Sequence, residues 1–431
     1  MELGPTLHQP TTMGPIRGLS ERPLTNVTKE SSNIVSIPPH EASLLTKLEP
    51  TALNLALRRF AQATADLACR PGNGEVTELR LSDWRPVARL QVPEHHVPTA
   101  RFGATDSHTH LGRWLTSDGG WIVPDVAALI ELMDRCNVET LVNLDGGWSA
   151  ELEDNLDRYD RPHPGRFVTF CHVDWTEADQ PGFGERLAVS LVASVNAGAA
   201  GLKVWKDLGL HVRDRDQRLI LPDDSRLAPL WQTAADLGIP VAIHTADPVA
   251  FFDPLDERNE RLEQLLDHPD WSFADPAFPR FERLIEALES LVAAHPSTTF
   301  IGVHMGCYSE NLRWVGRMLD TYPNFHVDIA ARIAELGRQP RATRALILAH
   351  PDRVLFGTDE YPPEEGLYAT HFRFLETADE WFPHTTADVP LMGRWGISGL
   401  ELPDVVLRKI YSENAARLIP ALARTRQEGV A

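Results

Sequence analysis

The sequence predicts an α/β protein whose main body is a (β/α)8 TIM barrel, and three observations support this. From Thr105 onward, short apolar runs alternate with amphipathic helical patterns, which is typical of repeated β-α units around a parallel sheet. The runs number eight, as such a barrel requires. No G-x-G-x-x-G or Walker-type loop follows a strand, which counts against the alternative, a doubly wound open sheet.

The chain before the barrel divides into two predicted parts. Residues 1–40 are rich in Pro, Thr, Ser and Asn, so burial cannot offset the entropy of ordering them, and we expect a flexible arm. Residues 41–104 predict a small extension: apolar residues recur at helical spacing up to Cys69, Pro50 divides them into two helices, and residues 74–84 alternate like a strand. The barrel domain then takes residues 105–431.

Seven of the eight strand candidates end in a polar or small residue, and the fourth ends in Trp205. In chain order they are residues 100–106, 139–145, 166–174, 200–205, 239–244, 299–304, 324–330 and 353–359. Helical periodicity follows at 124–137, 184–198, 224–238, 281–295, 310–322 and 341–350. Gly238 and Pro296 fall where helices should end, whereas segment 144–164 is charged and ambiguous.

One connection is far longer than usual. Residues 248–279, rich in Asp, Glu, Pro and aromatic residues, directly follow the fifth strand, and we interpret them as an insertion that forms a lid. The insertion and the amino-terminal arm are candidate sites of substrate specificity or of contacts in a homodimer.

Charge and cysteine usage limit the partners. The 431 residues include 41 Lys plus Arg and 61 Asp plus Glu, a net charge of −20 that repels nucleic-acid phosphates and anionic lipid headgroups. We therefore expect a small-molecule substrate and neither a nucleic-acid nor a membrane partner. The four cysteines form no C-x-x-C pair and the amino terminus has no signal-peptide pattern, so a cytoplasmic location is expected.

Metal-ligand residue types stand at the ends of four predicted strands. His108 and His110 project from the same side of the first strand, and His244, His304 and Asp359 end the fifth, sixth and eighth. Because reactive groups of such barrels gather at the carboxyl ends of strands, these side chains should form one ring. Imidazoles plus a carboxylate suit zinc or a similar divalent ion.

Such an ion lowers the pKa of bound water from about 15.7 to about 7, so a hydroxide nucleophile can exist at cellular pH. Asp359 is a catalytic candidate because it can accept the water's proton and pass it to a leaving group. His304 is the second catalytic candidate, because it can hold the water or polarise a substrate carbonyl. Asp106 has two interpretations: a carboxylate that fixes an imidazole, or a buried strand-end acid.

Candidate substrate contacts come from the other strand ends: Trp114, His172, Lys203, Trp205 and Arg332. A tryptophan is as readily a packing residue as a platform for substrate. Arg332 suits a substrate carboxylate, with a salt bridge to a barrel acid as the alternative. By strand alternation, Lys206 should point away from the site into solvent.

The motifs H-T-H (108–110), I-H-T (243–245), G-V-H-M-G (302–306), F-G-T-D (356–359) and I-Y-S-E-N-A-A-R-L (410–418) together resemble the amidohydrolase superfamily. They look most like the branch that contains aminocarboxymuconate semialdehyde decarboxylase and the resorcylate-type decarboxylases. The resemblance implies a distorted TIM barrel with one zinc or manganese ion on His108, His110, His244 and Asp359, and His304 just outside. Lys203 resembles the carboxylated lysine of binuclear members, although a single metal is expected.

The first expectation for function is a metal-dependent hydrolase that uses a metal-activated water on a small amide, ester or lactone. The alternative is a non-oxidative decarboxylase of a carboxylated aromatic or enol acid, and a hydratase is a further one. A catalytically silent barrel that only binds partners is the competing class. The sequence does not separate hydrolase from decarboxylase, because both use the same metal-ligand residues.

Overall fold

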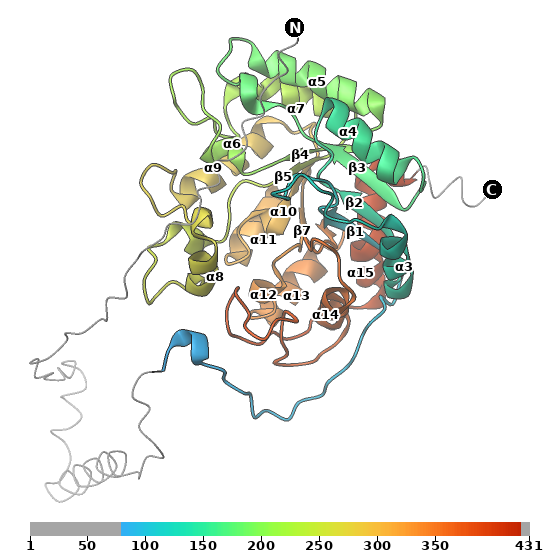
Figure 1. Ribbon diagram of the computed structural model, residues 1–431, viewed down its shortest axis with the longest axis vertical. Helices are drawn as coiled ribbons and strands as arrows, with labels where there is room; N and C mark the ends of the chain where they lie inside the picture. Colours follow the sequence, from blue (N-terminus) through green and yellow to red (C-terminus); the bar gives the residue numbers. More distant parts are fainter. Residues whose placement is uncertain (1–78, 424–431) are drawn as a thin grey trace, which may run out of the picture. The chain divides into compact units, whose positions relative to one another are not determined.

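Eight parallel strands form the centre of the structure, a computed structural model that describes residues 79–423 (Figure 1). They pair in chain order: β1 (Ala104–Thr109), β2 (Val138–Asn143), β3 (Phe167–Cys171), β4 (Gly201–Val204), β5 (Val241–Ile243), β6 (Phe300–Gly302), β7 (Phe325–Asp328) and β8 (Val354–Leu355). The chain beyond β8 bonds back to β1, with Ser107 N donating to Phe356 O (3.0 Å) and Asp359 N to His108 O (2.9 Å). The predicted barrel is confirmed, and the open sheet is excluded.

Helices surround the strands (Figure 1). The longer ones are α3 (Val126–Cys136), α4 (Ser149–Asn155), α5 (Phe183–Ala197), α7 (Ala228–Asp236), α9 (Phe281–Ala294), α11 (Leu312–Thr321), α13 (Pro340–Ala349) and α14 (Glu365–Glu376). They include all six predicted from periodicity. The ambiguous segment after β2 forms α4 and the π-helical turn η2 (Leu156–Asp160), which bury Leu152, Leu156 and Tyr159 beneath a charged outer face.

Shorter helical elements complete the described chain. They are η1 (Leu81–Asp83), η3 (Trp175–Glu177), α6 (Asp207–Leu210), η4 (Ser225–Leu227), η5 (Val249–Phe252), α8 (Leu262–Asp267), η6 (Pro269–Trp271), α10 (Val303–Gly306), α12 (Ile333–Leu336), α15 (Asp404–Arg408), η7 (Lys409–Glu413) and α16 (Asn414–Leu418). None of the helices within residues 79–423 is long and apolar enough to span a bilayer.

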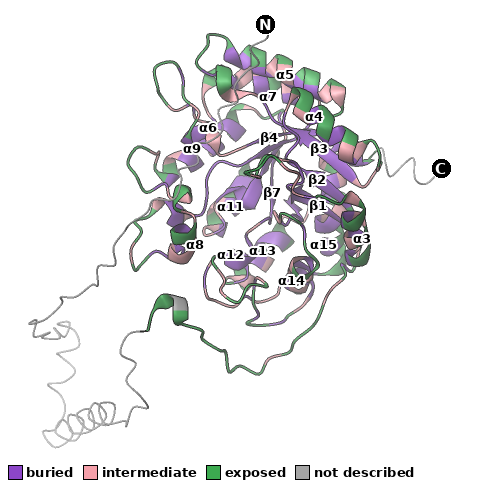
Figure 2. Cartoon of the chain, viewed as in Figure 1, coloured by how far each residue is buried: buried purple, intermediate pink, exposed green. Residues whose placement is uncertain are grey.

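The barrel strands are almost wholly buried (Figure 2). This explains their continuous apolar runs, because parallel strands are covered on both faces. At one end, Ala415, Ile419 and Leu422 pack with the strand residues Val142 and Val168. In barrels of this kind, sites form at the end where the strands have their carboxyl termini.

Two predictions concern the chain before the barrel. The arm of residues 1–40 and the helices expected up to Cys69 lie outside the described residues. The strand expected over 74–84 is wrong in its described part, since Leu81–Asp83 form a 3-10 turn. Asp83 and nearby Pro86 favour a turn over a ladder of hydrogen bonds. The compact unit that holds the barrel begins at Arg85.

The insertion at 248–279 packs on the outer part of the mouth. It contains η5, α8 and η6, and its residues Phe251, Leu265 and Phe273 pack with Phe281 and Leu284 of α9. This apolar cluster anchors the insertion to the barrel domain.

Candidate metal centre

His108 and His110 both turn one ring nitrogen into the mouth of the barrel. His108 Nδ1 donates to Asp328 Oδ2 and His110 Nδ1 to Asp145 Oδ1, each at 2.8 Å. The opposite nitrogens, Nε2, lie 3.4 Å and 2.9 Å from Oδ1 of Asp359. The carboxylate behind each ring fixes its orientation and tautomer, as is usual for histidines that bind metals.

Asp359 reaches the same point from the chain beyond β8. The strand ends at Leu355, so Asp359 does not itself end a strand as expected; it adopts a left-handed backbone conformation with φ 64°. Its position depends on Gly357, because a Cβ there would lie 2.9 Å from Cβ of His108. Only glycine lets this segment of the F-G-T-D motif approach β1 so closely.

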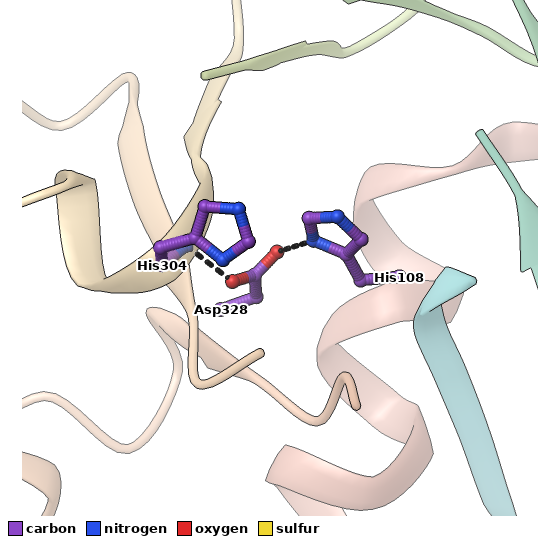
Figure 3. Close-up of side chains that lie close together, drawn as sticks. All are labelled: His108, His304 and Asp328. Carbon is purple, nitrogen blue, oxygen red and sulfur yellow. Dashed lines mark hydrogen bonds and ion pairs between the residues drawn. The ribbon is translucent and has the colours of Figure 1, made fainter. Parts of the chain in front are cut away.

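His304 lies in a tight left-handed turn and not on a strand, because β6 ends at Gly302. His304, Met305 and Cys307 have φ of 59°, 58° and 61°, values that cost L-residues about 1–3 kcal/mol each and gather at functional sites. The backbone N–H of His304 donates to Asp328 Oδ1 at 2.6 Å (Figure 3), and its Nδ1 donates to Ala330 O at 2.9 Å. Its Nε2 then lies 3.8 Å from Oδ2 of Asp359.

His244, directly after β5, lines the same mouth, and its ring centroid lies 4.6 Å from that of His304. Its Nε2 is buried and makes no hydrogen bond in the described chain, although Asp247 Oδ1 lies 3.3 Å away. A buried nitrogen without a partner costs free energy, unless it binds an ion.

Two sets of three potential ligand atoms lie within 4.8 Å of one another in the described chain: His108, His110 and Asp359, and His108, His304 and Asp328. His244 belongs to neither set. Imidazole nitrogens with a carboxylate oxygen, backed by further carboxylates, nevertheless form a donor set that fits zinc or manganese.

Burial and charge set the protonation of the site. Burial lowers the pKa of His244 to about 4 and that of His304 well below its ordinary value. Burial acts on His110 too, but the Asp145 and Asp359 carboxylates outweigh it and raise its pKa to about 9. Burial opposes ionisation of Asp359, yet the neighbouring imidazoles and Lys203 hold the pKa of this carboxyl well below its usual range. The site thus joins an ionised carboxylate to a neutral His304.

Asp106 has a structural role. It accepts hydrogen bonds from Thr358 N (3.0 Å), Thr358 Oγ1 (2.6 Å) and the Tyr368 hydroxyl (2.9 Å), so it ties β1 to the segment before Asp359. It bonds to no imidazole, so the interpretation as a carboxylate that fixes an imidazole is wrong, and Asp106 is a buried acid of the strand. Asp145 and Asp328 orient the imidazoles instead, and the signal for both was an acid at the end of predicted strands two and seven.

A cavity of about 380 Å3 lies over these residues. Of the expected substrate contacts, Trp114, Trp205 and Arg332 line it. Lys203 and His172 do not: the Lys203 ammonium is buried 4.9 Å from the Trp205 ring centroid, and Trp205 Nε1 lies 3.1 Å from His172 Nε2. Both side chains therefore contact Trp205.

The cavity also has walls that strand patterns did not predict: Lys206, Phe251, Arg261, Gln264, Trp271, Tyr361 and Met392. The expectation that Lys206 points away into solvent is wrong. β4 ends at Val204, so strand alternation no longer applies at Lys206, which pairs with Asp247 beside the cavity.

Arg332 is a buried cation that lines the cavity. It is only 6% exposed, and its NH1 donates to the Ala331 carbonyl at 2.8 Å. Within residues 79–423, the structure shows no ion pair between Arg332 and a carboxylate, so the alternative of a salt bridge to a barrel acid is not found.

A (β/α)8 barrel that gathers histidines and an aspartate at its mouth defines a class of metal-dependent hydrolases and lyases. A family model described as Amidohydrolase matches residues 153–421, which include His244, His304 and Asp359. The chain therefore belongs to the amidohydrolase family, and it is an enzyme.

The fold is similar to several solved structures. A 2,6-dihydroxybenzoate decarboxylase from Rhizobium is 17% identical over 74% of this chain and 99% of its own, with a TM-score of 0.49. A dihydroxybenzoic acid decarboxylase from Polaromonas sp. JS666 was solved with bound manganese and the inhibitor 2-nitroresorcinol. It is 16% identical over 74% of this chain and 97% of its own, with a TM-score of 0.49. An amidohydrolase from Burkholderia multivorans is 15% identical over 74% of this chain and 99% of its own, with a TM-score of 0.45. A search of curated proteins found no match.

Proposed function

We propose that the protein is a metal-dependent carboxy-lyase that releases carbon dioxide from a small planar carboxylic acid. The observation that carries the proposal is Arg332, a buried guanidinium that lines the cavity and forms no ion pair with the described chain. A buried cation of this kind calls for an anionic partner. A substrate carboxylate supplies one, and a neutral amide, ester or lactone does not.

The shape of the cavity supports a planar substrate. The Trp114 and Trp205 rings lie nearly parallel, with centroids 6.2 Å apart and 30° between planes. The centroid of the Trp205 ring lies 5.0 Å from that of the His110 ring. The Tyr361 ring meets the His110 ring edge-on, with centroids 5.8 Å apart. Flat aromatic walls favour stacking with an aromatic or conjugated acid.

His108, His110, His244 and Asp359 would hold one divalent ion, zinc or manganese. When bound, the ion supplies positive charge that orients the substrate's oxygens and stabilises negative charge as it develops. Two acidic residues, Asp328 and Asp145, keep the imidazoles of His108 and His110 in place. Neutral His304 donates its one N–H to Ala330 O, so its Nε2 can accept a hydrogen bond beside them.

The reaction replaces a carboxylate by hydrogen. In this proposal Asp359, which is ionised at rest, takes a proton from solvent and transfers it to the sp² carbon that bears the carboxylate. The bond from that carbon to the carboxylate then breaks, its electron pair restores the conjugated system, and carbon dioxide leaves. Arg332 holds the carboxylate before the bond breaks, and the aromatic walls exclude water.

A metal-dependent hydrolase is the second candidate. The observation that favours it is the low pKa of Asp359, because an ionised carboxylate is ready to take a proton from water. This would serve hydrolysis of a small amide, ester or lactone.

One experiment separates the two candidates. Protein loaded with zinc or manganese is incubated with a panel of carboxylated aromatic and enol acids, and with lactones and amides. We expect carbon dioxide release, measured by a coupled assay, and no hydrolysis. Hydrolysis of lactones or amides without carbon dioxide release would contradict the carboxy-lyase and favour the second candidate.

A further inference from the structure

Three ion pairs fix the start of α8, the helix of the insertion that lines the cavity. Glu260 pairs with Arg338 at 2.9 Å and Glu263 with Arg394 at 2.6 Å, while between them Arg261 pairs with Glu335. Arg261 and Glu335 are both almost completely buried. Breaking a buried pair costs about 3–5 kcal/mol, so this end of α8 is a fixed wall of the cavity.

Arg261 also orients the side chain of Gln264. Its NH1 donates to Oε1 of Gln264 at 2.9 Å, which assigns the oxygen of this amide to the guanidinium and leaves the amide nitrogen on the other side. That nitrogen has no hydrogen-bond partner in the described part of the chain, and Gln264 lines the same cavity as Arg332 and Asp359. Its two N–H groups are thus fixed donors available to a ligand.

We propose that Gln264 is a specificity-determining residue that donates a hydrogen bond to an oxygen acceptor on the substrate, away from the carboxylate that is lost. This inference rests on the proposed function, because it assumes that a planar carboxylate occupies the cavity. It narrows the substrate class to planar carboxylic acids with a second acceptor, such as a carbonyl or a further carboxylate. A fixed donor that stays unpaired penalises a ligand without that acceptor.

The test compares ligands of equal shape. Calorimetry measures binding of 3- and 4-acetylbenzoate, which carry a carbonyl, and of 3- and 4-isopropylbenzoate, which do not, to the metal-loaded full chain. We expect at least one acetyl isomer to bind about 10-fold more tightly than its isopropyl counterpart, the effect of one hydrogen bond of about 1.4 kcal/mol.

Two variants and one control complete the design. Q264L should bring the ratio of acetylbenzoate affinity to isopropylbenzoate affinity near one and leave the affinity for isopropylbenzoate unchanged. Q264E replaces a donor by an acceptor, so it should weaken the binding of acetylbenzoate further. Q180L, at an exposed loop position, should leave the ratio unchanged. An unaltered preference in both folded Gln264 variants, or no preference in the wild type, would overturn the role of Gln264. Failure of the wild type to bind any of these carboxylates would instead refute the proposed function, and the inference with it.

Discussion

Asp328 accepts a hydrogen bond from Nδ1 of His108 at 2.8 Å, so one carboxylate on β7 fixes the histidine on β1 (Figure 3). Its second oxygen accepts the backbone N–H of His304 at 2.6 Å and stabilises the left-handed turn there. Both Asp328 and His108 are about 1% exposed. Asp328 therefore couples the position of a proposed metal ligand to that of a proposed catalytic histidine.

Replacing Asp328 by Asn should weaken metal binding. The Asn carbonyl can still accept from His304 N, but its NH2 group cannot accept the N–H of His108, so the imidazole loses its orientation. We expect metal affinity to fall about 10–100-fold, measured by competition with a chromogenic chelator. The control is D388N, at an exposed aspartate of the same chain. Equal affinities for D328N and wild type would show that the hydrogen bond does not support a metal ligand.

Replacing Arg332 should weaken use of a carboxylate substrate. A hydrogen bond to a charged group contributes about 1.5–3 kcal/mol, so R332M should lower kcat/KM for decarboxylation about 10–150-fold. R332K keeps the charge but loses the planar fork, and should recover only part of the loss. Should R332M retain wild-type kcat/KM with unchanged metal content, Arg332 does not hold the carboxylate.

Removing the metal should lower stability as well as activity. A metal present at 100 times its dissociation constant stabilises the folded state by about 2.7 kcal/mol, because it binds only the folded site. Dialysis against a chelator should therefore lower Tm, and adding back zinc or manganese should restore both Tm and activity. A Tm that the chelator leaves unchanged, in protein with measured metal loss, would show that no folded metal site exists.

Stability should fall in mild acid because of buried histidines outside the metal site. Burial lowers the pKa of His371 to about 4, below its value of about 6.5 in the unfolded chain, so the unfolded state binds more protons between these values. The stabilisation is present above pH 6.5 and is lost as pH falls towards 4. H371Q should reduce the slope of the unfolding free energy against pH by up to about 1.4 kcal/mol per pH unit.

Urea unfolding at several pH values measures this slope. H96Q, at an exposed histidine, serves as the control and should keep the wild-type slope. If H371Q and wild type have the same slope, His371 is not the residue that senses acid.

Regular features of the fold could be predicted from the sequence. Strands buried on both faces leave continuous apolar runs, and outer helices such as α9 leave a 3.6-residue period, so barrel and helices followed from spacing alone. His108 and His110 were found because both lie on or directly beside β1, where alternation holds. The amidohydrolase resemblance is confirmed by the family match.

Features beyond the strand ends could not be predicted this way. Lys206 lies two residues past β4, and its side-chain direction depends on a local turn. Gln264 and Arg261 reach the cavity from an insertion whose path depends on long-range ion pairs. Asp328 and Asp145 act through other side chains, so an acid near a strand end was the only sequence signal for them and their partners could not be predicted. The hydrolase, a homodimer, a cytoplasmic location and the roles of Lys203 and His172 stay predictions.

The central claim is that residues from β1, β5 and the segment after β8 share one divalent ion. Anomalous diffraction from crystals of metal-loaded protein, collected at the zinc and manganese edges, locates that ion directly. We expect a single peak about 2.0–2.3 Å from Nε2 of His108, His110 and His244 and from a carboxylate oxygen of Asp359. A peak elsewhere in the chain, or none in protein that turns over substrate, would contradict the account.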